Sequence, residues 1–335
     1  MKKLYTVIIL LVFFLCGLGY FMLDLLAYAA KPASNNTKEQ VFNIKSGSNF
    51  NDVAEKLAAM GLISSTFKFK ILAVLKGVDK KLQAGEYRLT AAMPTALILK
   101  TLVEGNVRLH RLTIPEGYSL KQVADAAETA GIISKDPFLK AAANSTLIAK
   151  AGLKADSFEG YLFPETYYFP TGVSAEYIIL TMFSRFNSVI TPAWRIRAQE
   201  LGLSLHQIIT LASIIEKESG DPAENPVISS VFHNRLKLKM KLQSDPTVIY
   251  SIKDYKGNIQ KKHLLANTPY NTYRIKGLPP GPIANPGKKA IHAALFPDNT
   301  RLLFFVARKD GTHEFSSNIK DHNKAVRKYQ LRKKR

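Results

Sequence analysis

The sequence has a single cysteine, Cys16, among its 335 residues. One thiol excludes a disulfide within the chain and any metal site built from several cysteines. The sequence also lacks a glycine-rich loop that ends in Lys-Ser or Lys-Thr, and it lacks a His-Glu-x-x-His motif. Neither a P-loop nucleotide site nor a zinc protease site is therefore indicated. Because the seven histidines are scattered along the chain, we expect neither a metal nor a cofactor.

Acidic residues are scarce: 26 Asp and Glu stand against 47 Lys and Arg, which gives a net charge of +21. With 46% hydrophobic and 22% charged residues, the composition is that of a folded protein. The charge implies an acidic partner, namely nucleic acid, an anionic membrane face or an anionic polymer. Nucleic-acid binding rests on charge alone, because no base-stacking motif accompanies it. We therefore expect no nucleic-acid partner.

The N-terminus predicts a membrane anchor. Lys2 and Lys3 precede 20 almost uncharged residues, Leu4 to Leu23, which is long enough to cross a bilayer. The positive flank places the N-terminus in the cytoplasm. Ala27-Tyr28-Ala29 resembles a cleavage site, so a cleaved signal peptide is the alternative. The apolar run is longer than in most signal peptides, which favours a retained anchor over residues 1–30 and an exported remainder.

A duplicated pattern follows a polar linker at residues 31–41. Phe42 to Gly47 and Leu112 to Gly117 each predict a short strand and a glycine turn, followed by a short amphipathic helix with a glycine stop. Between the two copies, Gly85 to Leu89 predicts a strand and Met93 to Gly105 predicts a helix. Strand–helix–helix–strand units of this kind resemble LysM modules, which bind glycans containing N-acetylglucosamine. We assign residues 42–106 to a LysM-like subdomain, with a plain α+β adaptor as the alternative.

Residues 107–330 are predicted to form a second, mainly helical domain that carries loops rich in polar and aromatic side chains. Phe158 to Pro170 is dense in aromatic residues, which suits either stacking on sugar rings or a rigid packed corner. Thr268 to Arg274 and Gly277 to Gly287 are expected to be ordered loops, since Pro and Gly restrict the backbone there. Such loops are where a site would be built, although ordinary turn chemistry explains the same residues. Residues 331–335 form a basic tail.

One helix stands out, with the sequence LHQIITLASIIEKESG from Leu205 to Gly220. Its apolar residues recur at helical spacing, Ser204 is suited to the N-cap, and Gly220 followed by Asp-Pro is a stop signal. Two carboxylates, Glu216 and Glu218, fall on opposite shoulders of the apolar face. Carboxylates at the edge of a buried face are costly unless they are paired or used.

Position along this helix distinguishes the two carboxylates. Glu218 lies in the last turn, where the partial negative charge of the helix C-terminus should raise its pKa and suit a general acid. Glu216 lies deeper, and we expect it to pair with a cation, with Arg235 as the candidate. The alternative is a solvated Glu-Lys-Glu end of a core helix.

If Glu218 is the one carboxylic acid in a loop-lined groove, few reactions on a glycosidic bond are open to it. Glycoside hydrolysis usually needs two carboxyl groups. One acid suffices when the 6-hydroxyl of N-acetylmuramic acid attacks its own C1, and the product then has a 1,6-anhydro end. A hydrolytic muramidase would need a second carboxyl, with Asp245 and Glu165 as candidates. A non-catalytic scaffold that binds murein through the LysM-like units is an alternative from another class.

Several spaced sequence blocks resemble the signature blocks of the YceG-like endolytic murein transglycosylases, and the similarity covers nearly the whole chain. The blocks are Glu159 to Tyr167 (EGYLFPETY), Ala212 to Glu218 (ASIIEKE), Leu242 to Tyr250 (LQSDPTVIY), Tyr270 to Tyr273 (YNTY) and Gly277 to Gly281 (GLPPG).

The resemblance implies that Glu218 is the catalytic acid and that Ser219 orients it. It further implies a single-pass inner-membrane enzyme of α+β class. That enzyme would have its catalytic domain in the periplasm and cut nascent peptidoglycan strands near the peptidoglycan synthases. The other substrate-binding residues that we expect are Gln243, Asp245, Tyr270, Asn271, Tyr273, Glu165 and Tyr167.

Overall fold

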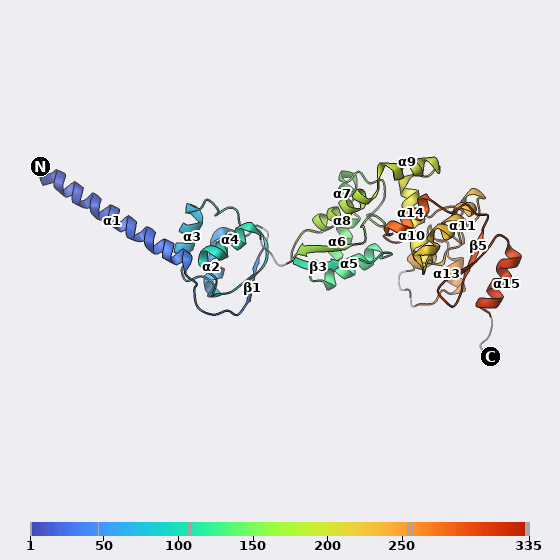
Figure 1. Ribbon diagram of the computed structural model, residues 1–335, viewed down its shortest axis with the longest axis horizontal. Helices are drawn as coiled ribbons and strands as arrows, with labels where there is room; N and C mark the ends of the chain where they lie inside the picture. Colours follow the sequence, from blue (N-terminus) through green and yellow to red (C-terminus); the bar gives the residue numbers. More distant parts are fainter. Residues whose placement is uncertain (1, 46, 106–108, 253–254, 256, 332–335) are drawn as a thin grey trace. The chain divides into compact units, whose positions relative to one another are not determined.

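The computed structural model describes residues 2–45, 47–105, 109–252, 255 and 257–331 (Figure 1). The chain divides into two compact units. Unit 1 contains Met1–His110 and Tyr168–Val173, and unit 2 contains Arg111–Tyr167 and Ser174–Arg335. Among the described residues helices predominate and the strands form three two-stranded sheets, so the α+β class is confirmed. The expected boundary between residues 106 and 107 and most of the expected tail at 331–335 lie outside the described residues.

Helix α1 (Lys2–Ala30) is longer than the apolar run alone predicts. Residues Leu4–Ala30 are long and apolar enough to cross a membrane. Beyond the run, Leu25, Tyr28 and Ala29 are buried in the core of unit 1. The Tyr28 hydroxyl donates to the carbonyl of Ser65 at 2.7 Å. The apolar helix therefore continues into the folded unit without a break, and cleavage at Ala27-Tyr28-Ala29 would remove core residues.

The rest of unit 1 has the expected order of strand, helix, helix and strand. Strand β1 (Gln40–Ile44) pairs antiparallel with β2 (Gly85–Leu89), and α2 (Phe50–Ala59) and α3 (Thr66–Leu75) connect them. Helix α4 (Thr95–Glu104) follows and ends at a left-handed glycine. Strand β1 begins two residues inside the expected linker.

The second copy of the repeat also has helices between two paired strands. Strand β3 (Leu109–Thr113) pairs with β4 (Thr166–Pro170), and three helices lie between them in sequence. The aromatic segment that we expected to be a loop thus ends in a strand. The intervening helices are α5 (Leu120–Thr129), α6 (Lys135–Ala142) and α7 (Ser145–Lys150).

The remainder of unit 2 is a helical body with one hairpin. Strands β5 (Phe304–Ala307) and β6 (His313–Ser316) form the hairpin. The last helix is α15 (Ile319–Tyr329). The other helices are α8 (Ala175–Val189), α9 (Pro192–Glu200), α10 (Leu205–Glu218), α11 (Asn225–Lys237), α12 (Asp245–Tyr250), α13 (Lys261–Leu265) and α14 (Lys288–Leu295), with a 3₁₀ turn at Pro222–Glu224.

Helix α10 forms where the sequence predicts it. Ser204 and Gln207 make a reciprocal capping box at its start, which satisfies backbone N–H groups that have no partner within the helix. All eight residues from Ile208 to Ile215 are buried. The helix packs against α14, α11 and α12. A rigid, buried helix therefore carries Glu218 on its last turn.

The packing of α1 predicts that two neighbouring leucines differ in their effect on stability. Leu25 is 2% exposed and belongs to the core of unit 1, whereas Leu26 is 63% exposed. Leu25→Ala should lower the free energy of unfolding of unit 1 by about 2–5 kcal/mol, because it leaves a cavity. Leu26→Ala should change it little. Thermal unfolding of the full chain in detergent micelles measures both, and equal melting temperatures would contradict this packing.

Candidate active site

A cavity of about 520 Å³ in unit 2 contains the side chain of Glu218. Its walls come from the ends of α10 and α11, the segment before α12, the β5–β6 hairpin and helix α15. The lining residues are Glu218, Arg235, Gln243, Asp245, Tyr273, Phe304, Phe305, Val306, Ala307, His313, Ile319, His322, Asn323, Val326 and Gln330.

Glu218 has the properties of a proton donor near neutral pH. Burial raises its pKa from 4.5 to about 7, and the nearby carboxylate of Asp245 acts in the same direction. The Ser244 hydroxyl donates to Oε1 of Glu218 at 2.6 Å, and this bond and the charge of Arg235 oppose the shift. The expected rise in pKa is confirmed in direction. Burial, rather than the helix terminus, is its main cause.

Arg235 lies beside Glu218 and not beside Glu216, so the expected Glu216–Arg235 pair is wrong. The Arg235 side chain is buried, and it donates to the carbonyls of Leu303 at 2.7 Å and Leu242 at 2.5 Å. Glu216 instead accepts from the N–H of Gly287 at 2.9 Å, at the start of α14. Residues two apart on a helix point to different sides, so the two carboxylates meet different neighbours.

An unusual backbone conformation brings Ser244 to Glu218. Gln243 has a φ of +50°, which is uncommon for a residue with a side chain. Its N–H donates to the carbonyl of Thr272 at 3.2 Å, and the Ser244 N–H donates to the Thr272 hydroxyl at 2.9 Å. The segment is therefore fixed to the loop that follows α13. Gln243 and Asp245 both face the cavity.

The loop that contains Asn271 and Tyr273 supports this wall. The Tyr273 hydroxyl donates to Asp245 at 2.7 Å. Asn271 is fully buried, and its amide group donates to carbonyls of its own loop, including that of Ala266 at 2.6 Å. Its Oδ1 accepts from the Tyr273 N–H. Asn271 thus holds Tyr273 in place and does not line the cavity.

Three other expected substrate-binding residues are not among those that line the cavity around Glu218. Tyr270 stacks at an angle on Tyr250, with ring centroids 4.9 Å apart. Glu165 is paired with Arg185. Tyr167 is buried, and its hydroxyl donates to a backbone carbonyl at 2.6 Å. Membership of one of the sequence blocks therefore does not place a residue near Glu218.

The hydroxyl bonded to Glu218 belongs to Ser244 and not to Ser219, the serine that the sequence suggested. The Ser219 hydroxyl donates to the carbonyl of Asp221 at 2.6 Å, and Ser244 is the hydroxyl bonded to Glu218. Ser244 stands between Gln243 and Asp245, which were both expected in the site, so its position in that sequence block could have identified it. No comparable feature of the sequence pointed to Phe304 and His322, because only the folded chain brings them into the same cavity as Glu218.

A second buried carboxylate, Glu159, lies outside this cavity. Burial raises its pKa to about 7. Its two oxygens accept from the Leu120 N–H at the start of α5, at 2.9 and 3.0 Å, and the Tyr250 hydroxyl donates to it at 3.1 Å. Glu159 thereby joins α5 to the end of α12, the helix whose first residue is Asp245. Among the described residues, no three His, Cys, Asp or Glu side chains are grouped to hold a metal ion.

The raised pKa of Glu218 predicts a pH-dependent cost to stability. The folded protein retains this proton between pH 4.5 and about 7, while the unfolded chain loses it, so stability falls as pH rises through that window. Glu218→Gln should remove this loss and exceed the parent by up to roughly 3 kcal/mol at pH 8, with little difference at pH 4. Denaturant unfolding at both pH values measures it. Parallel pH dependence in the two proteins would contradict the shift.

Comparison with known proteins places the chain in a family. The model of the YceG-like family matches residues 42–328. A protein named endolytic murein transglycosylase from Bacillus subtilis is 36% identical over 89% of this chain and 87% of its own length. One of the same name from Streptococcus pneumoniae is 30% identical over 92% of this chain and 62% of its own length. A crystal structure of a YceG-like protein from Listeria monocytogenes superposes with a TM-score of 0.61, at 35% identity, over 86% of this chain and 99% of the other. The chain is a member of the YceG-like family.

Proposed function

We propose that this protein is an endolytic peptidoglycan lytic transglycosylase in which Glu218 acts first as acid and then as base. The observation that carries the proposal is the carboxyl group of Glu218, whose pKa burial raises to about 7, in the wall of a cavity of about 520 Å³. A group with this pKa is protonated often enough to donate, and basic enough afterwards to accept, at neutral pH. The names of the relatives support the same activity.

The proposed reaction needs no water and no second carboxyl group. Protonated Glu218 donates to the glycosidic oxygen between N-acetylmuramic acid and N-acetylglucosamine as the bond from C1 to that oxygen breaks. The resulting carboxylate accepts the proton of the muramic 6-hydroxyl, whose oxygen forms a bond to C1. The products are a free 4-hydroxyl on N-acetylglucosamine and a 1,6-anhydro end, and Glu218 is again protonated.

The neighbours of Glu218 have separate roles in this proposal. Ser244 holds Oε1, which leaves Oε2 to face the glycosidic oxygen. Arg235 stabilises the carboxylate that forms after proton donation. Gln243 and Tyr273 line the same cavity and would bind the sugars. Asn271 acts through Tyr273, as a positioning residue. For Tyr270, Glu165, Tyr167 and Ser219, substrate contact would require sugar subsites beyond this cavity.

The N-terminal part of the chain supports action at the membrane. Helix α1 would anchor the protein in the inner membrane with its N-terminus in the cytoplasm. The net charge of +21 suits both anionic lipid and the carboxylates of murein peptides. Glycan strands are synthesised at this membrane surface, so newly made glycan would be the substrate and peptidoglycan synthases would be neighbours. Cleavage within such strands would limit their elongation. The LysM-like arrangement of unit 1 is proposed to bind glycan.

A hydrolytic muramidase is the second candidate, because Asp245 shares the cavity with Glu218. Hydrolysis would require Asp245 to activate water or to attack the sugar. Its carboxylate already accepts from Tyr273, which favours a role in positioning. Glu165 is a weaker second carboxyl group, since it is paired with Arg185 away from the cavity lining.

Product analysis tests the proposed reaction. The full chain in detergent, acting on uncrosslinked glycan strands, should release internal fragments with 1,6-anhydro ends that mass spectrometry identifies. Glu218→Gln should lower the rate by about 10²–10⁴-fold, because it removes the acid. Glu165→Gln is the matched control and should retain activity. The full chain is needed because part of α1 belongs to the core of unit 1.

Other products would reject the proposal in distinct ways. Reducing ends would establish hydrolysis and direct attention to Asp245. Undiminished cleavage by Glu218→Gln would remove Glu218 from the chemistry. Glycan binding without cleavage by the parent would favour a scaffold.

Substitutions of Ser244 and of Asp245 should shift the pH profile of kcat/KM in opposite directions. For the parent, kcat/KM should fall above about pH 7 as Glu218 ionises. Ser244→Ala removes a hydrogen bond that lowers this pKa, so the fall should move to higher pH, with a lower maximum because the acid is no longer oriented. Asp245→Asn removes a charge that raises the pKa, so the fall should move to lower pH. Shifts of the same sign in both variants would contradict the assigned electrostatics.

A further inference from the structure

Helix α3 is apolar on two sides, and only one of them is covered. Its sequence is TFKFKILAVL. Phe69 and Leu72 are buried in the core of unit 1, whereas Phe67 is 64% exposed, Val74 62% and Leu75 59%. A surface helix ordinarily turns a polar face outward. Large apolar side chains gathered on an exposed face indicate a surface that contacts something apolar.

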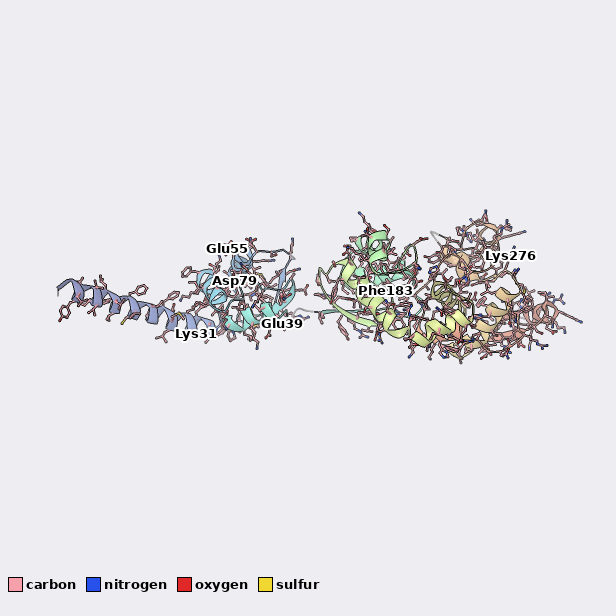
Figure 2. All side chains as sticks on the ribbon, turned by 90° about the horizontal axis from the view of Figure 1, so that it is seen from above. Lys31, Glu39, Glu55, Asp79, Phe183 and Lys276 are labelled. Atoms are coloured by element: carbon pink, nitrogen blue, oxygen red, sulfur yellow. The ribbon has the colours of Figure 1, made fainter. Side chains whose placement is uncertain are left out.

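Contacts with α1 place α3 where the membrane-spanning helix leaves the bilayer. Lys68 forms an ion pair with Asp24 at 2.6 Å, and Asp24 is the first charged residue after the apolar run that ends at Leu23. Leu75, seven residues after Lys68, shares that side of the helix. Figure 1 shows α3 beside the end of α1, while β1 lies across unit 1 from it. Figure 2 labels Lys31, which directly follows α1, on the ribbon of the same unit.

Charge and shape around α3 match a lipid surface. Residues 66–81 contain five lysines and one acidic residue, Asp79. Lys76 and Lys100 border an apolar groove of about 560 Å³, to which Ala29 and Ala30 at the end of α1 also contribute. Apolar side chains flanked by lysines are typical of helices that lie in the interface of anionic membranes. A second copy of this basic face would be repelled, and a glycan would find few polar partners there.

We propose that α3 docks on the anionic bilayer surface from which α1 emerges. Phe67, Val74 and Leu75 enter the boundary between head groups and acyl chains, and the lysines contact lipid phosphates. Because α3 is packed against the end of α1, the docked surface is continuous with the spanning helix. Unit 1 is thereby held against the membrane at two points and cannot rotate freely about the anchor. This proposal rests on the proposed anchoring by α1 and is independent of the proposed activity.

Site-specific fluorescence of the full chain in lipid nanodiscs tests the docking. In a Cys16→Ser background, an environment-sensitive dye is attached at Leu75→Cys, or at Val41→Cys as the control. Val41 is also an exposed apolar residue of unit 1, at 53%, but it lies on β1. In bilayers containing phosphatidylglycerol, the dye at position 75 should emit at shorter wavelength and be quenched by lipid-attached nitroxide. The dye at position 41 should show neither change.

Charge variants and two controls complete the test. Replacing Lys76 and Lys80 with Gln should lower the ratio of docked to undocked dye by about fivefold per lysine. A dye at Phe67→Cys gives a second report if the first variant misfolds. Equal solvent exposure at positions 75 and 41 would overturn the proposal. So would shielding that rises with the number of protein copies per nanodisc, which would indicate self-association, or shielding that appears only with added glycan fragments.

Discussion

Ionising a carboxyl group inside a folded protein costs free energy, and the surroundings of Glu218 follow from that constraint. The end of α10 shares a cavity with α11, the β5–β6 hairpin and α15, and burial there raises the pKa of Glu218 to about 7. Ser244 and Arg235 stabilise the ionised form, and without them burial would suppress it further. The balance between burial and these two neighbours produces a group that can both give and take a proton.

The helix that carries Glu218 was predictable from the sequence, because it depends on local pattern. A capped, periodic apolar segment that ends in Glu-Lys-Glu fixes α10, whereas the choice of Glu218 as the catalytic acid came from the family resemblance. Ser244 was not predictable as its partner, since the contact depends on the positive φ of Gln243 and on hydrogen bonds to Thr272. Arg235 was assigned to the wrong carboxylate, because the periodicity of one helix does not reveal which side faces its neighbour.

The far wall of the cavity is a second case in which local pattern was insufficient. His322 stacks on Phe304, with ring centroids 5.2 Å apart, and the Arg235 guanidinium lies over the same ring at 5.4 Å. These residues come from α15, β5 and α11. The charge and periodicity of these segments alone do not show that they enclose a cavity around Glu218.

At the other end of the chain, helix α1 and unit 1 form one structural element. The last turns of α1 supply Leu25 and Tyr28 to the core, so unit 1 cannot be separated from this helix without loss of packing. In the proposed docking, the exposed apolar face of α3 extends this connection to the lipid, and membrane attachment would then be coupled to the folding of unit 1. Glu218 and its hydrogen-bond partner Ser244 lie wholly within unit 2.

The most direct test of a protonated Glu218 is its own carboxyl absorption. Infrared difference spectra between the parent and Glu218→Gln, recorded from pH 4 to pH 9, would isolate the stretching band of the protonated acid. We expect this band to persist past pH 5 and to disappear with a midpoint near pH 7. A midpoint near 4.5, the ordinary value for glutamate, would contradict the burial of the acid and the mechanism built on it.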